Sequence, residues 1–200
     1  MINQHEYQKR RNELAQKLPE GSIAIIPAAQ EFLRNGDAHY RFRQDSNFLY
    51  LTGFNEPEAL LLVVAGAEAH SILFNRPRNA GEEQWTGKRL GQEGALRELG
   101  MQAAFSIAEI SEELPQLIAG KSAIYYSLAR YPEIEKRIMQ ALVTLKGFVR
   151  RGIKVPEKLC DLEPILGEMR LFKSDAELDL MRQAALISVK AHEQAMRRCK

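Results

Sequence analysis

The sequence is poor in the residues from which metal and redox sites are built. Its 200 residues include two cysteines and four histidines. Cys160 and Cys199 form no CxxC pair, and the histidines lie apart along the chain, with no HExxH pattern. The sequence therefore predicts reduced thiols and no metal site. The isolated histidines are His5, His39, His70 and His192.

Long apolar runs are also absent. No stretch approaches the roughly 18 apolar residues of a membrane span, and residues 1–20 lack the apolar core of a signal peptide. The net charge is only +2, and basic residues are interspersed with acidic ones. We therefore expect a cytoplasmic protein that binds neither membranes nor nucleic acid.

Catalytic motifs are missing as well. There is no GxSxG elbow, and no spacing supports a Ser-His-Asp or Cys-His arrangement. The segment 87–91 is too short and wrongly ordered for a phosphate-binding GxxxxGK loop. The residues by themselves therefore predict no catalytic group in this chain.

What is present is the composition of a soluble globular protein, with 45% hydrophobic and 27% charged residues. Residues 41–64 hold two hydrophobic runs on either side of a turn with glycine and proline. These runs, 48–52 and 59–64, predict two strands at the centre of a sheet, joined by a tight connection. A third, adjacent antiparallel strand is predicted at 70–74.

Other elements have clear boundary signals. A capping box at Asn3 and Glu6 predicts an opening helix, and Pro132 and Gly147 bound a later one. The remaining predictions are strands at 22–26 and 122–127, loops at 30–45 and 75–91, and helices within 91–100 and 107–118. Residues 149–173 are predicted to be a linker with one short helical turn. Clustered strands followed by alternating helices and strands predict an α/β or α+β domain that ends near residue 170.

The last helix has an unusually wide apolar surface. Ser174 and Glu177 form a capping box, and a helix of about 25 residues follows. Its apolar side chains cover more than half of the circumference, beyond the ~100° stripe of a one-sided surface helix. We expect a complete domain followed by the first helix of a second, truncated one. The alternative is a helix that docks on its own domain or dimerises. His192, near the apolar side, is interpreted as a hydrogen-bonded core residue.

Three blocks of this sequence resemble one known family. They are RQDSNFLYLTGFNEPEA at 43–59, WTGKRLG at 85–91 and EMRLFKS at 168–174. In this order they are similar to the N-terminal domain of aminopeptidase P, of the creatinase and prolidase superfamily. The resemblance implies a mixed sheet flanked by helices at 1–170, and the first helix of a truncated pita-bread catalytic domain at 171–200.

The resemblance also implies a function for the parent protein. Members of the family release the N-terminal residue that precedes proline, using two metal ions, usually manganese. The ions are held by two Asp, two Glu and one His of the later domain, which would lie beyond Lys200. We therefore expect the chain alone to be inactive and to bind no metal. Its expected partners are the catalytic domain, other subunits of a homo-oligomer and peptides with proline second.

Three residues match family positions near the substrate. Trp85 corresponds to a tryptophan that reaches a neighbouring subunit's active site, although a lone tryptophan is often a core residue. Arg150 matches an arginine near the cleft, with the adjacent Arg151 and a solvated surface role as alternatives. Asp37 matches an acidic residue on the subunit-facing loop. The resemblance thus implies substrate-binding roles for all three residues.

Two other functions stay open. The chain could be a stand-alone binding or assembly module of the same fold, with a peptide or protein as ligand. It could also be a fragment of a prolidase-like dipeptidase, because prolidases and creatinases share the architecture. The loop around Trp85 and the junction at 168–174 favour aminopeptidase P.

Overall fold

The computed structural model describes residues 2–67 and 69–199. Its centre is a six-stranded sheet with the order β6-β5-β4-β1-β7-β8. The strands are β1 (Ser22–Pro27), β4 (Leu60–Val64), β5 (His70–Asn75), β6 (Ala103–Ser106), β7 (Ala123–Tyr126) and β8 (Lys158–Asp161). β4 pairs antiparallel with β1 and β5, and the other neighbours are parallel. The mixed sheet implied by the resemblance is confirmed.

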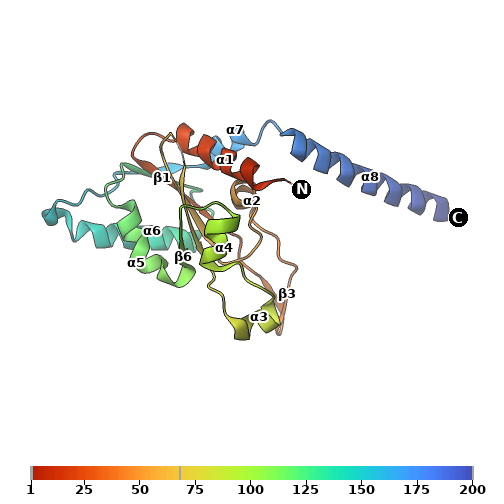
Figure 1. The fold of residues 1–200 in the computed structure, drawn as a ribbon, viewed down its shortest axis with the longest axis horizontal. Coiled ribbons are helices and arrows are strands. Elements are labelled where there is room, and N and C mark those ends of the chain that lie inside the picture. The colour runs from red at the N-terminus through yellow and green to blue at the C-terminus, as the bar shows by residue number, and fades with distance from the viewer. Residues whose placement is uncertain (1, 68, 200) are drawn as a thin grey trace.

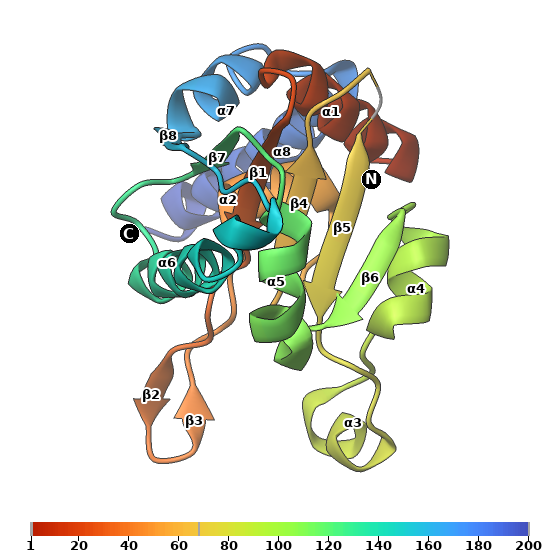
Figure 2. The ribbon, with the colours of Figure 1, turned by 90° about the vertical axis from the view of Figure 1, so that its left-hand side faces the viewer.

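Helices cover both faces of this sheet. The helices of the described residues are α1 (Gln4–Lys17), α2 (Ser46–Thr52), α3 (Ala80–Thr86), α4 (Gly91–Glu98), α5 (Ile110–Ile118), α6 (Pro132–Lys146), α7 (Glu163–Met169) and α8 (Asp175–Arg198), with 3-10 turns η1 (Ile107–Glu109) and η2 (Val149–Arg151). α3 and α8 have no buried residue and do not cover the sheet. α5 and α6 lie in front of the sheet in Figure 2, and α8 extends away from the domain in Figure 1.

The two faces contribute to separate hydrophobic cores because side chains alternate along each strand. Ala24 and Ile26 of β1 pack with buried residues of α1, α2, α4 and α7. Ile23 and Ile25 of the same strand pack with α5 and α6 on the opposite face. The central strands are therefore buried on both sides, as their unbroken apolar runs indicate.

Several sequence predictions are confirmed. The strands predicted at 22–26, 59–64, 70–74 and 122–127 correspond to β1, β4, β5 and β7. Asn3 caps α1 by accepting a hydrogen bond from the Glu6 backbone N–H. Helices α4 and α6 also form where the sequence places them. Gly147 is the C-cap of α6, as predicted, and it has a right-handed conformation instead of the left-handed one of many glycine caps.

The strand predicted at 48–52 is wrong, because these residues form the helix α2. Asp45 accepts hydrogen bonds from the backbone of Asn47 and Phe48, and Gly53 ends the helix with φ 65°. Phe48 and Leu51 are buried against the sheet at helical spacing. The second neighbour of β4 is therefore β1, and no hairpin joins 48–52 to β4.

Three predicted connections contain regular structure. The loop predicted at 75–91 holds the helix α3, which Asn79 caps by accepting hydrogen bonds from the backbone of Gly81 and Glu82. The segment 30–45 holds a small hairpin of β2 (Leu33–Asn35) and β3 (Ala38–His39). The predicted linker at 149–173 contains β8, which pairs with β7, and the helix α7. The pattern of 158–161 gave little strand signal because β8 is an edge strand with mainly exposed side chains.

Two adjacent arginines of α1 stabilise the C-terminal end of α2. The last carbonyls of a helix have no partner inside it. Arg10 donates to the Tyr50 carbonyl at 3.1 Å, and Arg11 donates to the Leu51 carbonyl at 3.0 Å. Arg11 also reaches the Leu99 carbonyl, directly after α4, at 2.8 Å.

Arg11 is only 1% exposed, and burial lowers the pKa of its guanidinium to about 10. It therefore stays charged at neutral pH. The negative ends of the α2 and α4 dipoles face this charge, which offsets part of the cost of burying it.

Replacing Arg11 by methionine should lower the free energy of unfolding by about 3 kcal/mol, because two buried carbonyls would lose their donors. Urea denaturation followed by circular dichroism measures this change. Lys9→Met, an exposed position of the same helix, should shift stability by less than about 0.5 kcal/mol. An Arg11→Met chain as stable as the unmodified one would contradict this account.

Candidate functional site

The three residues implied by the resemblance lie in different surroundings. Trp85 is in α3, and Asp37 lies in the turn between β2 and β3. Figure 2 shows α3 and this hairpin at the same end of the molecule, although they are separated. Arg150 is in η2, and the chain after α6 lies at the left-hand extremity in Figure 1. The described chain does not bring the three together.

Trp85 is 89% exposed, which excludes the alternative that it is a core residue. It nevertheless sits on a well-defined helix. Asn79 caps α3, and the ion pairs Arg78–Glu83 and Arg89–Glu82 hold the helix to the chain on both sides. The exposure predicted for 75–91 is confirmed, and α3 presents a large aromatic ring to solvent from an ordered support.

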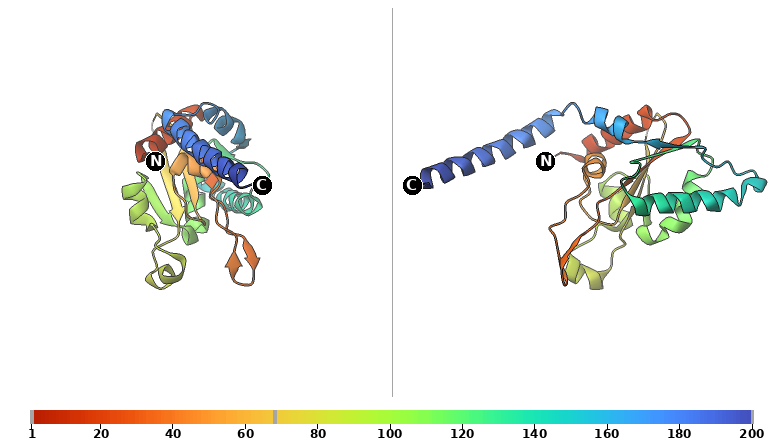
Figure 3. Two further views of the ribbon diagram at one scale, coloured as in Figure 1. Left: turned by 90° about the vertical axis from the view of Figure 1, so that its right-hand side faces the viewer. Right: turned by 180° about the vertical axis from the view of Figure 1, so that it is seen from behind.

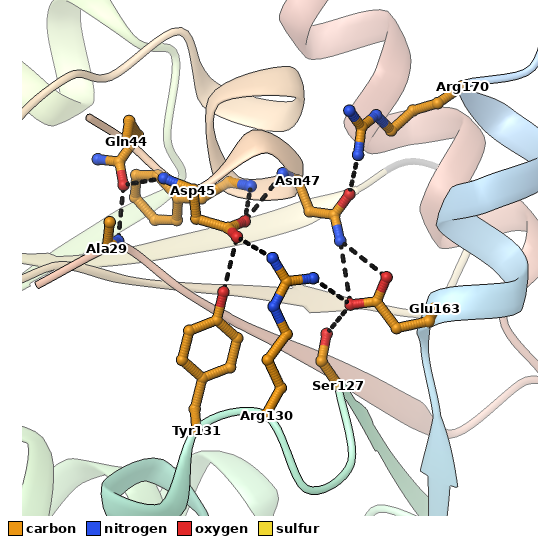
Figure 4. Close-up of polar contacts among 10 residues, drawn as sticks. Ala29, Gln44, Asp45, Asn47, Ser127, Arg130, Tyr131, Glu163 and Arg170 are labelled. Carbon is orange, nitrogen blue, oxygen red and sulfur yellow. Dashed lines mark hydrogen bonds and ion pairs between the residues drawn. The ribbon is translucent and has the colours of Figure 1, made fainter.

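A polar network that the sequence did not reveal surrounds the N-terminal end of α2 (Figure 4). Asp45 is buried, and its Oδ2 accepts hydrogen bonds from Arg130 at 2.9 Å and from the Tyr131 hydroxyl at 2.6 Å. The other oxygen caps α2. One carboxylate therefore joins α2 to the loop between β7 and α6.

Glu163, at the start of α7, extends this network. It accepts from Ser127 at 2.6 Å, from Arg130 at 3.0 Å and from the side-chain amide of Asn47 at 3.2 Å. Arg170 in turn donates to the carbonyl oxygen of the Asn47 amide. Two carboxylates and two guanidiniums thus balance in charge, and every carboxylate has donors. The arrangement is that of a structural junction between three segments distant in sequence.

Burial and the hydrogen bond to Asp45 raise the pKa of Tyr131 well above its usual value. The phenol donates to a carboxylate, and ionisation would place two negative charges side by side. Tyr131 therefore stays protonated while the domain is folded. Asp45 could have been recognised in the sequence as the N-cap of a helix. It was not, because the residues that follow, 48–52, have the pattern of a strand.

Within residues 2–67 and 69–199, no group of three or more His, Cys, Asp or Glu side chains lies close enough to hold a metal ion. No helix in this described part is long and apolar enough to cross a membrane. His192 is exposed on α8, so its interpretation as a core residue is wrong for this chain.

Comparison with known proteins gives consistent matches. Residues 7–125 match the family described as aminopeptidase P, N-terminal domain. The Xaa-Pro aminopeptidase of Escherichia coli K12 is 39% identical over 201 residues, which cover 100% of this chain and 46% of that protein. "Intermediate cleaving peptidase 55, mitochondrial" of Arabidopsis thaliana is 30% identical over 94% of this chain and 36% of that protein.

Solved structures agree over the whole chain. "Proline aminopeptidase P II from Yersinia pestis" is 43% identical with a TM-score of 0.95. "Zn substituted E. coli Aminopeptidase P in complex with product" is 39% identical with a TM-score of 0.96. Both matches cover 100% of this chain and 46% of the other. The chain thus spans about half the length of the proteins it matches.

The raised pKa of Tyr131 predicts a pH dependence of stability. The unfolded chain ionises this phenol near its usual pKa of about 10, whereas burial and the hydrogen bond to Asp45 raise its pKa in the folded chain. The stabilisation from Tyr131 is therefore present below about pH 10 and lost as the pH rises further.

Urea unfolding of the unmodified chain and of Tyr131→Phe between about pH 8 and 11.5 tests this, since phenylalanine does not ionise. The unfolding free energy of the unmodified chain minus that of Tyr131→Phe should fall above about pH 10. Tyr40→Phe, at an exposed tyrosine, is the matched control. A Tyr131→Phe difference that does not change with pH would contradict the prediction.

Proposed function

The chain belongs to the family of aminopeptidase P N-terminal domains, and we propose that it is the non-catalytic part of a longer, metal-dependent Xaa-Pro aminopeptidase. The observation that carries this proposal is the match of the whole chain to 46% of aminopeptidase P structures at TM-scores of 0.95 and 0.96. In the proposal, the other half of the protein carries out the cleavage.

The metal chemistry belongs to that other half. A pair of ions, for which we propose manganese, would supply an activated hydroxide and stabilise the oxyanion that forms at the scissile carbonyl. The substrate's proline has no N–H and a fixed φ, so the site must suit a tertiary amide. No group of three or more His, Cys, Asp or Glu among the described residues could hold a metal ion, and we propose that both ions lie in the other half of the protein.

The surface of α8 supports a domain boundary near residue 170. No residue of α8 is buried, although its sequence is that of a helix with a wide apolar surface. We propose that α8 is the first helix of the pita-bread catalytic domain, whose other elements cover these side chains. The exposed apolar residues of α8 include Leu180, Met181, Leu186, Ile187, Val189 and Met196.

The exposed positions suggest how this domain reaches the substrate. In a homo-oligomer, Trp85 on α3 and Asp37 on the neighbouring hairpin would face another subunit's cleft. The Arg151 guanidinium lies over the Phe148 ring, 5.2 Å from its centroid, which favours Arg150 as the residue near the substrate. A cytoplasmic location is part of the same proposal and rests on the sequence.

The chain alone should show no turnover of an Xaa-Pro peptide in the presence of manganese, whereas the protein encoded by the longer reading frame should cleave it. Chromatography that monitors release of the first residue measures the turnover of both proteins. If the reading frame encodes no further domain, the stand-alone binding module is the correct function instead. Turnover by the 200-residue chain would contradict the proposal directly.

In the longer protein, Trp85→Ala should lower kcat/KM for an Xaa-Pro peptide about tenfold, which corresponds to roughly 1.4 kcal/mol. The melting temperature of the 200-residue chain should not change, because there the ring is 89% exposed. Val143→Ala, at an exposed position of α6, is the control and should leave kcat/KM unchanged. Equal kcat/KM for the unmodified protein, Trp85→Ala and Val143→Ala would show that Trp85 is not part of the substrate site.

A further inference from the structure

The direction of α8 relative to the sheet depends on very few contacts. Figures 1 and 3 show the helix extending away from the domain. Within α8, partial burial is limited to its first turn, at Ala176, Glu177 and Leu178. The contacts that orient the helix must therefore be made at this end.

Arg10 lies at the centre of these contacts. Its side chain is only 5% exposed, and its guanidinium lies 4.2 Å from the centroid of the Tyr50 ring and 5.5 Å from that of Tyr7. The group forms ion pairs with Glu6 at 3.1 Å and with Glu177 of α8 at 3.4 Å. Stacking and pairing together fix the position of its charge.

Glu177 has two roles at once. Its Oε2 accepts from the Ser174 backbone N–H at 2.9 Å, which completes the capping box of α8. Its Oε1 pairs with Arg10. The same side chain therefore begins the helix and joins it to α1.

Tyr50 connects this pair to the segment before α8. Its hydroxyl donates to the Met169 carbonyl at 3.0 Å, and the Arg170 guanidinium lies 5.9 Å from the ring centroid. The chain that leads into α8 is thus held against the same ring that carries Arg10.

Apolar burial in the first turn of α8 is limited to the partly buried Ala176 and Leu178. Two hollows, of about 420 Å³ and about 590 Å³, both have Arg10, Tyr50 and Glu177 among their lining residues. Open space around the first turn of α8 means that close-packed side chains do not fix its angle. The charge pair remains as the directional contact.

We propose that Arg10 is a positioning residue that sets the direction of α8 relative to the sheet, acting through Glu177. A helix of 24 residues is about 36 Å long, so a rotation of about 10° at its start moves its end by about 6 Å. This inference holds whatever segment covers α8, and it is independent of the proposed function.

The variant Glu177→Gln separates the two roles of this residue. Glutamine serves at the third position of a capping box as glutamate does, so the helix start is retained. The charge that pairs with Arg10 is lost. Arg10→Met removes the guanidinium itself but also removes a donor to α2, so it is the less selective variant. Glu193→Gln removes an ion pair inside α8 and is the matched control.

Spin-label distance measurements on this 200-residue chain test the proposal. One label is placed on the native, exposed Cys199 and the other on Glu93→Cys at an exposed position of α4, with Cys160→Ser. Glu177→Gln should at least double the width of the distance distribution, whereas Glu193→Gln should leave it unchanged. The melting temperature of Glu177→Gln should equal that of the parent.

An unchanged distribution in Glu177→Gln would overturn the proposal, whatever Arg10→Met shows. A broadened distribution that also appears in Glu193→Gln would overturn it too, because the motion would then arise within α8. Broadening restricted to Glu177→Gln and Arg10→Met would support it.

Discussion

The C-terminal end of α2 needs hydrogen-bond donors, and the N-terminal helix supplies them. Arg10 and Arg11 donate to successive carbonyls of α2, and Arg11 also reaches the end of α4. A buried carbonyl without a donor costs about twice what an ordinary hydrogen bond contributes. The positions of α1, α2 and α4 on one face of the sheet therefore depend on two adjacent side chains.

The opposite end of α2 is joined to the other half of the chain. Asp45 caps the helix and binds Arg130 and Tyr131, and Glu163 links the same loop to α7. α2 is too short to be stable by itself in water, because isolated helices shorter than about 12 residues rarely form. Its seven residues are helical because both ends meet partners from distant segments.

The features that concern function are at the surface. A capped, charged helix exposes Trp85, and α8 exposes apolar side chains over its length. Exposed apolar side chains of this kind are unfavourable in water for an isolated domain, and they are typical of surfaces that contact another domain or subunit. They agree with the proposal that the domain forms about half of a longer peptidase. Arg10 lies where the two halves would meet, so one residue contributes both to the stability of the domain and to the direction of α8.

The sequence by itself determined the buried strands β1, β4, β5 and β7, the long helices with caps, the exposure of Trp85 and the family, since periodicity, capping residues and short motifs are local properties. Tertiary structure decided the helical state of 48–52, whose aromatic, apolar pattern is typical of a strand. It also decided the strand β8, the network around Asp45, and the separation of Arg150 from Trp85. The helix at 48–52 and the network around Asp45 depend on partners about 40 to 120 residues away in sequence. Only folding shows which distant donors satisfy which buried acceptors.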